Sequence, residues 1–239
     1  MRFFYAPDVA SCNELPQEEA AHAVRVLRLQ AGDELMLMDG VGSFWRADIT
    51  VATHKHCFFV VKEKIPQPRL WNGCLRLAVA PTKNMDRMEW LAEKATEIGL
   101  DALTFLNCDF SERKVLKSER IDKILVSAMK QSHKAWKPEL TEIISFAAFV
   151  KQDFKGQKFI AHCYNDTELM PEGKPFLLDV LNAGDALVLI GPEGDFSANE
   201  VRMALQYGFQ PISLGESRLR TETAALVAVH LMNLKNRLR

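Results

Sequence analysis

The sequence predicts an α/β protein of two domains, a small β-rich domain over residues 1–70 and a larger parallel-sheet domain over residues 71–239. From Leu75 onward, short apolar runs typical of buried strands alternate with helical stripes, and this order implies a parallel sheet. Before that point, alternating strand patterns and a glycine turn indicate a compact β structure. The run Ile65-Pro66-Gln67-Pro68 separates the two patterns, since two prolines so close together favour an extended linker.

Composition and charge are those of an ordinary globular chain. Its 239 residues are 48% hydrophobic and 26% charged, with a formal net charge of −1. No apolar run has the length of a membrane span, and the N-terminus lacks the apolar stretch of a signal peptide. The five cysteines are widely spaced, and the close pair His54 and His56 lies in a strand pattern, which argues against disulfides and a metal site. We therefore expect a cytoplasmic protein with no membrane partner and no metal.

The first domain is expected to present a few basic side chains on a β scaffold. Arg25 and Arg28 are three residues apart, so they share one face if the segment is helical and can contact phosphates together. Their alternative role is pairing with Glu18 and Glu19. The expected elements are a short helix over residues 18–29, an apolar run over 34–39, a hairpin turn over 40–42, and strands over 43–51 and 57–64.

A basic stretch lies between residues 111 and 137, in spite of the nearly neutral chain. It holds eight basic and three acidic residues, a net charge of +5. A local patch of this kind is a better indicator of nucleic-acid binding than the charge of the whole chain. The alternative is an ordinary solvated helix face. Lys130 and Lys134 are the candidates for phosphate contacts in this stretch.

The second domain is expected to alternate strands with helices from its first strand to the end of the chain. Its last helix carries an apolar stripe, which either belongs to the core or packs against another chain. The expected strands cover residues 75–80, 102–108, 158–163, 186–190 and 211–214, with a weaker strand and helix within 139–154. The expected helices cover residues 85–98, closed by Gly99, then 119–132, the segment from the Ser197 cap to Tyr207, and 223–238.

Two glycine loops follow the strands expected over residues 186–190 and 211–214. The first is Gly191-Pro192-Glu193-Gly194, and Ser197 with Glu200 then forms a capping box at the start of a helix. The second is Gly215-Glu216-Ser217, after which Thr221 or Thr223 is expected to cap the last helix. Strand ends that open side by side into such loops form a ligand site at the carboxyl edge of a parallel sheet.

These loops offer backbone groups and few bulky side chains, which suits an adenine and a ribose. Neither of the usual phosphate-binding glycine motifs is present, so a nucleotide hydrolase is not supported. The end of the strand over residues 158–163 can supply a third wall, with His162 as a further candidate and a conceivable catalytic base. The alternative is that both loops are merely tight turns.

The motifs IGPEGDFSANE (residues 190–200) and LGESRLRTETAAL (residues 214–226) resemble those of the SPOUT methyltransferases. They are most similar to the bacterial small-subunit rRNA uridine-N3 methyltransferase family. The likeness extends over nearly the whole chain, with HxxxVLR at residues 22–28, DGxG at 39–42 and EKATEIG at 93–99. Two departures stand out: Asp195 replaces a glycine of the pattern, and Ser217-Arg218 replaces a more apolar pair. We expect Asp195 to face solvent and to favour the helix N-terminus by its charge.

The resemblance implies a PUA-like RNA-binding β-barrel followed by a SPOUT domain with a deep trefoil knot. It further implies that the knot holds S-adenosylmethionine, which leaves as S-adenosylhomocysteine, and that two copies form a homodimer through the C-terminal helix. The residues expected to bind the cofactor are His162, Ile190, Gly191, Pro192, Glu193, Gly194, Leu214, Gly215, Ser217, Leu219, Arg220, Thr221, Thr223 and Ala224.

The implied activity is methylation of N3 of a uridine in 16S ribosomal RNA of the small subunit. Arg220 is the candidate for stabilising the uridine imidate, and Glu193 is the second catalytic candidate. The RNA-binding candidates are Arg25, Arg28, Lys130 and Lys134. One alternative is a SPOUT methyltransferase that acts on another RNA nucleotide. The other is a non-catalytic RNA-binding protein, which would leave the two loops without a purpose.

Overall fold

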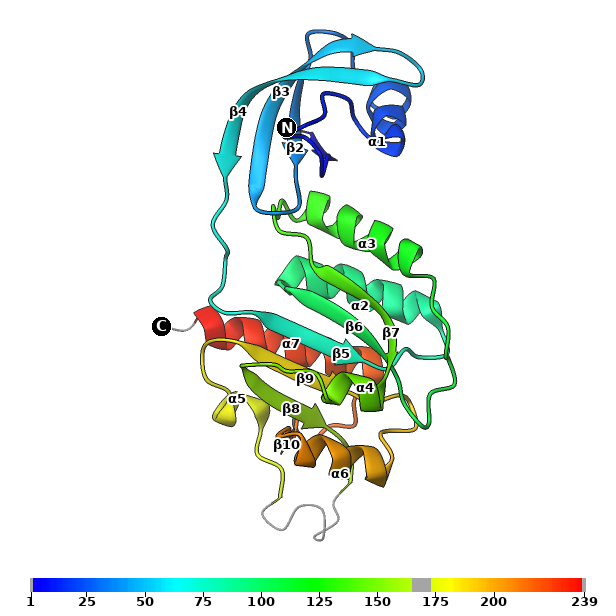
Figure 1. Cartoon of the computed structure of the whole chain (residues 1–239), viewed down its shortest axis with the longest axis vertical. Coiled ribbons are helices and arrows are strands. Elements are labelled where there is room, and N and C mark those ends of the chain that lie inside the picture. Colours follow the sequence, from blue (N-terminus) through cyan, green and yellow to red (C-terminus); the bar gives the residue numbers. More distant parts are fainter. Residues whose placement is uncertain (1, 165–172, 238–239) are drawn as a thin grey trace. The chain divides into compact units, whose positions relative to one another are not determined.

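The computed structural model describes residues 2–164 and 173–237 of the chain (Figure 1). Its internal contacts divide the chain into two compact units, and the division falls within one long helix. The first unit consists of Met1–Arg69 and Val126–Lys137, and the second of Leu70–Leu125 and Pro138–Arg239. In the part of the chain that is described, no helix has the length and apolar character needed to span a membrane.

The first unit is built on a four-stranded sheet in the order β1-β2-β3-β4. β1 runs parallel to β2, whereas the other neighbours are antiparallel. Phe4, Leu35, Leu37 and Phe59 belong to the buried apolar cluster of this unit. The elements are β1 (Phe3–Tyr5), α1 (Gln17–Ala21), η1 (His22–Val26), β2 (Glu34–Met38), β3 (Ser43–Ala52) and β4 (Cys57–Pro66).

The turn between β2 and β3 receives the chain that follows the long helix. Gly42 N donates to Ala135 O at 3.0 Å, and Trp136 Nε1 donates to Gln67 O at 3.1 Å. Gly42 has a φ of 110°, and a Cβ at this position would lie 2.2 Å from Cζ2 of Trp136. Only glycine therefore fits here. These contacts explain why residues 126–137 belong to the first unit.

The helix predicted over residues 18–29 ends earlier in the structure. α1 continues into η1, a turn of the wider π-helix, which stops at Val26. Leu29 N donates to Ala23 O, six residues back, at 3.0 Å, and this wide turn closes the helix. Arg28 has a φ of 55°, in the left-handed region. The prediction that Arg25 and Arg28 share one helical face is therefore wrong.

The second unit contains a six-stranded parallel sheet in the order β10-β8-β9-β5-β6-β7. The predicted parallel α/β architecture is thus confirmed. The strands are β5 (Leu75–Val79), β6 (Ala102–Asn107), β7 (Glu139–Ser145), β8 (Gln157–Ala161), β9 (Ala186–Ile190) and β10 (Gln210–Ile212). The helices are α2 (Met85–Ile98), α3 (Ser118–Gln131), α4 (Phe146–Val150), α5 (Leu177–Val180), α6 (Ala198–Gln206) and α7 (Thr221–Arg237).

Successive residues of β9 enter different apolar clusters. Ala186, Val188 and Ile190 pack with residues of α2 and α7. Leu187 and Leu189 pack with residues of α4 and α6. Helices therefore cover both faces of the sheet, as is usual for parallel sheets, and this leaves the strand ends as the exposed edges (Figure 1).

The predicted capping box at the start of α6 is confirmed. Ser197 Oγ accepts from Glu200 N at 3.2 Å, while Ser197 N donates to Glu200 Oε2 at 2.8 Å. Such a cap stabilises a helix by about 1 kcal/mol. The last helix begins at Thr221, two residues before the predicted start, and Leu238 lies outside the described residues. Neither Thr221 nor Thr223 therefore precedes the helix as its cap.

Candidate functional site

Three strand ends meet at the carboxyl edge of the second unit's sheet. β8 lies between β9 and β10, and its last residue, Ala161, is paired with Ile190 on one side and Ile212 on the other. The prediction that the two glycine-loop strands open side by side is therefore wrong, because β8 separates them. His162, the residue directly after β8, thus follows a strand that lies between the strands of the two glycine loops.

The first glycine loop turns tightly after Ile190. Asp195 N donates to Pro192 O at 2.9 Å, which closes a turn over residues 192–195. A Cβ at Gly191 would lie 3.0 Å from Phe196 N, so the backbone there is closely packed. Gly191 and Pro192 are buried, whereas Glu193 and Gly194 are exposed at the turn.

Asp195 joins the first glycine loop to the end of β8. Its Oδ2 accepts from Cys163 N at 2.7 Å, and its Oδ1 accepts from Phe196 N at 2.8 Å. The expectation that Asp195 faces solvent is wrong, because its carboxylate is occupied by these two backbone groups. Its φ of 66° lies in the left-handed region, where glycine is at ease and aspartate is better tolerated than most residues. This conformation explains why the methyltransferase motif has a glycine at the position of Asp195.

His162 is buried at the end of β8 and has both ring nitrogens without a hydrogen-bond partner among the described residues. His162 is only 6% exposed. Burial lowers the pKa of His162 to about 4; the nearby Lys174 cation acts in the same direction, and Asp195 acts against it. The imidazole is therefore neutral at pH 7. It offers one donor and one acceptor to an uncharged group and is a weak proton acceptor.

An arginine of α2 connects an acidic residue of the first glycine loop with one at the start of α7. Arg87 Nη1 lies 3.5 Å from Glu193 Oε1, and Arg87 Nε lies 3.6 Å from Glu222 Oε1. Glu193 Oε2 also accepts from Lys83 N at 3.2 Å. Glu222 is buried in the first turn of α7, and its Oε2 has no partner in the described part of the chain. Both acids are thus held by one cation.

The second glycine loop is more open than the first. Gly215 has a φ of 114°, and a Cβ there would meet nothing within 4 Å. Gly215 N donates to Ser213 Oγ at 3.1 Å, which fixes the start of the loop. Arg220 is exposed, and no described residue pairs with its side chain, while its carbonyl accepts from Ala224 N at 2.8 Å.

The predicted cofactor-binding residues all lie at the end of β9, in the three loops or in the first turn of α7. Their environments differ from one loop to the next. The buried ones are His162, Ile190, Gly191, Pro192 and Thr221. The half-buried ones are Leu214, Leu219, Thr223 and Ala224, and the exposed ones are Glu193, Gly194, Gly215, Ser217 and Arg220.

The predicted RNA-binding residues of the first unit differ in how their charges are used. Lys130 Nζ lies 2.5 Å from Oε1 of the buried Glu19, so its charge is largely compensated. Arg25 Nε donates to His54 O at 3.2 Å, a neutral group, and Lys134 also has a partner. Arg28 is exposed and unpaired among the described residues.

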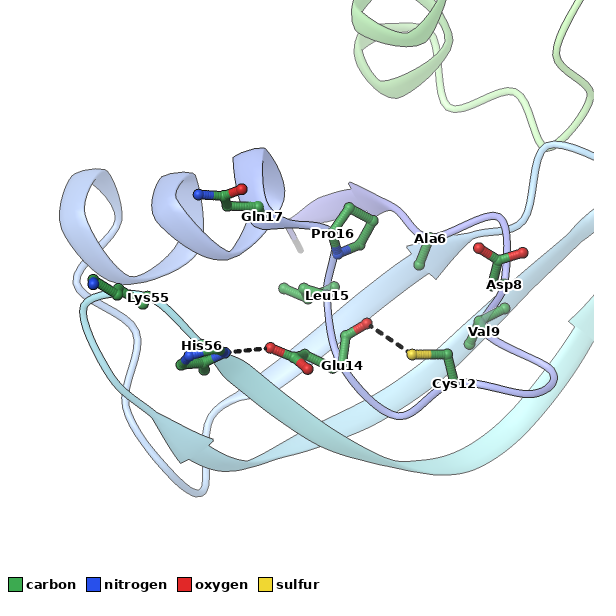
Figure 2. Close-up of a pocket in the computed structure, with 10 residues that line it drawn as sticks. All are labelled: Ala6, Asp8, Val9, Cys12, Glu14, Leu15, Pro16, Gln17, Lys55 and His56. Atoms are coloured by element: carbon green, nitrogen blue, oxygen red, sulfur yellow. Dashed lines mark hydrogen bonds and ion pairs between the residues drawn. The ribbon is translucent and has the colours of Figure 1, made fainter.

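One pocket of the first unit has a volume of about 520 Å³, and none of the predicted site residues lines it. His56 Nδ1 lies 2.6 Å from Glu14 Oε1, and Cys12 Sγ donates to Glu14 O at 3.6 Å (Figure 2). The polar atoms at its centre thus satisfy one another. The lining residues are Ala6, Asp8, Val9, Cys12, Glu14, Leu15, Pro16, Gln17, Lys55 and His56.

Two residues of the second unit were missed in the sequence. Arg87 lies in α2, far from both motifs along the chain, and only the adjacency of β5 and β9 brings its helix to the first loop. Phe110 follows β6 and touches Gly194: a Cβ at that glycine would lie 3.3 Å from Phe110 Cβ. An aromatic residue three positions after a strand and directly before the basic stretch is the signal that could have identified Phe110.

Two family models match this chain. One, described as the RNA methyltransferase domain, matches residues 71–233. The other, described as the RNA methyltransferase PUA domain, matches residues 15–62. The first match covers more than half of the chain and includes the three-loop edge.

Individual proteins show the same likeness. The chain is 33% identical to ribosomal RNA small subunit methyltransferase E of Synechocystis sp., covering 87% of this chain and 68% of that protein. It is 44% identical to a probable rRNA-methyltransferase from Porphyromonas gingivalis, with a TM-score of 0.90 over 99% of this chain and 98% of the other. It is 26% identical to ribosomal RNA small subunit methyltransferase E from Neisseria gonorrhoeae bound to S-adenosyl methionine, with a TM-score of 0.82 and coverages of 98% and 97%.

Substitutions of Asp195 should separate its hydrogen bonds from its backbone conformation. Asp195→Ala loses both bonds and keeps the left-handed φ, whereas Asp195→Gly loses the bonds but relieves a backbone cost of about 1–2 kcal/mol. We therefore expect Asp195→Ala to be less stable than Asp195→Gly by about 1 kcal/mol in urea denaturation. The exposed Asp153→Ala serves as the control, with unchanged stability. Equal stability of the alanine and glycine variants would contradict this explanation.

Proposed function

The chain belongs to the RNA methyltransferase family, and we propose that it methylates 16S ribosomal RNA of the small subunit at N3 of a uridine, with S-adenosylmethionine as the methyl donor. Relatives named as small-subunit rRNA methyltransferases support the substrate class. Structural relatives with bound S-adenosyl methionine support the donor. A ribosomal RNA substrate also supports a cytoplasmic protein.

One observation carries the proposal: both motif loops and the buried His162 converge at one edge of the sheet. A buried histidine with two unpartnered ring nitrogens is costly unless a ligand supplies the partners. Adenosine can accept from one nitrogen and donate to the other. The closely packed backbone at Gly191 and the open space at Gly215 fit a ligand held mainly by backbone groups. We propose that the cofactor-binding residues named above hold S-adenosylmethionine here.

The reaction requires that N3 of the uridine lose its proton and attack the methyl carbon as the carbon–sulfur bond breaks. The leaving sulfur becomes a neutral thioether, so the pocket has no new charge to stabilise on the donor side. The uridine imidate instead carries negative charge on its two carbonyl oxygens before and during attack. Arg220, exposed beside the second loop, is suited to stabilise that charge. We propose that Glu193, held by Arg87, orients ligand groups at the first loop.

The first unit is proposed to be a PUA-like barrel over residues 1–70 that binds RNA. Residues 13–15 support this, because Leu15 N donates to Cys57 O and Phe59 N donates to Asn13 O, both at 2.9 Å. The short segment before α1 thereby extends the sheet beyond β4, toward closure. Arg25, Arg28, Lys130 and Lys134 remain the proposed phosphate contacts. Arg28 ranks first because its charge is unpaired.

The methyltransferase domain is proposed to span residues 71–239 and to carry the deep trefoil knot implied by the resemblance. The strand order β10-β8-β9 supports this, since the chain leaves β8 for β9 and returns to the other side of β8 for β10. Tracing the chain in an electron-density map of the crystallised protein is the test.

One experiment tests the function as a whole. Purified protein and labelled S-adenosylmethionine are incubated with small ribosomal subunits, or with naked 16S RNA, from cells that lack this enzyme. We expect one labelled base, a uridine carrying the methyl group on N3. Label on another nucleotide would identify a different RNA methyltransferase. RNA binding without label would favour a non-catalytic RNA-binding protein.

Arg220 and Arg218 form a matched pair, because both are exposed arginines of the second loop. We expect Arg220→Ala to lower the single-turnover rate of methylation by roughly 100-fold at saturating cofactor, since it removes a charge that stabilises the imidate. Arg218→Ala should retain a rate near that of the wild type. Calorimetry gives the cofactor affinity of each variant, so that both rates are compared with the cofactor site filled. Equal rates for the two variants would remove Arg220 from the chemistry.

The salt dependence of RNA binding should distinguish free cations from paired ones. Each phosphate contact releases counterions, so Arg28→Ala should reduce the slope of log affinity against log salt by about one unit. Lys62 pairs with Asp48 at 2.9 Å, and Lys62→Ala should leave the slope unchanged as a control. Lys130→Ala should have a smaller effect than Arg28→Ala. An unchanged slope for Arg28→Ala would move RNA recognition away from this part of the first unit.

We propose a homodimer through α7, because this helix has apolar residues that pack at the edge of the core and are only half-buried. Leu226 and Val227 are among them, whereas Ala225 and Ala228 are fully buried within the unit. Sedimentation at micromolar concentration should give twice the chain mass of 27.0 kDa. Val227→Arg should shift the protein toward monomer with its thermal stability largely kept. A fully active wild-type monomer would contradict the proposal.

A further inference from the structure

Hydrogen bonds hold the segment after β6, residues 108–113, while one aromatic ring in this segment stays exposed. Cys108 N donates to Ser111 Oγ at 3.0 Å, and Asp109 N donates to Glu200 Oε1 at 3.0 Å. Asp109 Oδ2 also accepts from Ser197 Oγ at 2.6 Å. A little further on, Arg113 Nη2 donates to Lys83 O at 2.7 Å. The backbone around Phe110 is thus fixed by contacts to two other segments, the start of α6 and the residues before α2.

Phe110 itself is 51% exposed although its surroundings are held in place. A phenylalanine that leaves half its surface in water forgoes part of the roughly 1.5–3 kcal/mol that burial of such a side chain contributes. Its Cβ packs beside Gly194, as a Cβ built on that glycine would lie only 3.3 Å away. The ring is therefore a rigid apolar surface directly beside the first glycine loop.

The charges around this ring favour a nucleic acid over an apolar protein surface. The hydrogen bonds of Arg113 go to a neutral carbonyl, so its charge is not compensated there. Lys114 and Lys117 are exposed, and no described acid pairs with either. Lys83 does pair with Glu112, at 3.2 Å. Three cations thus remain for phosphates within a few residues of an exposed aromatic ring.

Residues of the same segment also line a polar hollow. It has a volume of about 350 Å³, and Asn107 and Lys114 are among its lining residues. The Oδ1 atom of Asn107 is buried and has no hydrogen-bond partner in the described part of the chain. An unpartnered acceptor of this kind can accept a hydrogen bond from an N–H group of a ligand, such as one on the edge of a base.

We propose that Phe110 is a stacking platform for a base of the RNA substrate, next to the cofactor loop, with Arg113, Lys114 and Lys117 contacting the adjoining phosphates. Sequence-specific RNA recognition commonly uses unstacked bases that stack on aromatic side chains. This inference rests on the proposed function, since it assigns the RNA side of the same site. Phe110 contributes to binding of RNA and not to binding of the donor.

The test compares Phe110→Ala, Phe110→Leu and Phe110→Trp in filter binding to small-subunit RNA that lacks the methyl group. Loss of one base–aromatic stack costs about 1–3 kcal/mol, so Phe110→Ala should bind RNA about 5- to 150-fold more weakly. Phe110→Leu should be similarly weak, because it keeps apolar volume without an aromatic face. Phe110→Trp should bind at least as well as the wild type. Tyr207→Ala, at another exposed aromatic residue, is the control and should bind normally.

Cofactor calorimetry and sedimentation complete the experiment. Affinity for S-adenosylmethionine and the oligomeric state should be the same in all Phe110 variants and the wild type. Unchanged RNA affinity in Phe110→Ala, or full affinity in Phe110→Leu, would overturn the stacking proposal. So would a loss of cofactor affinity or of dimer in these variants. Filter binding does not depend on methylation, so a wild-type protein that binds RNA but transfers no methyl group would contradict the proposed function alone.

Discussion

The position of β8 is the constraint on which the rest of the site depends. β8 hydrogen-bonds to β9 on one side and to β10 on the other, in the same direction. Because all three strands are parallel, their carboxyl ends lie at one edge of the sheet. The segments that follow the three strands therefore begin at that same edge. The pairing of Ala161 with both Ile190 and Ile212 places those ends at the same level. Backbone pairing alone thus brings His162 between two motifs that are far from it in the sequence.

Once the loops are together, side-chain contacts hold them in position. Asp195 binds the backbone of Cys163 and thereby joins the first glycine loop to the loop of β8. Arg87 lies within ion-pair distance of Glu193 and Glu222, and so relates the first loop to the start of α7. Neither contact involves a ligand. The site is therefore largely preorganised, which lowers the entropy that binding would otherwise cost.

Sequence patterns predicted those features that depend on local chemistry. The α6 capping box is confirmed because its two partners are three residues apart and require nothing from the rest of the fold. The order of strands was not predictable in this way, since apolar runs do not specify which neighbours they pair with. Arg28 was not predictable either, because its left-handed backbone follows from the π-turn at Leu29. Arg87 was not predictable because its helix reaches the site only through the pairing of β5 with β9.

Charge pairing in the structure also changes which cations are available for function. Arg87 is engaged by two carboxylates and Lys130 by one, so neither has its full charge left for RNA. Arg220 at the second loop and Arg28 in the first unit are exposed and unpaired among the described residues. A chain with a formal net charge of −1 can therefore still present positive charge locally, because its acidic residues neutralise particular basic ones and leave others free. The free cations, and not the net charge, decide where a polyanion can be held.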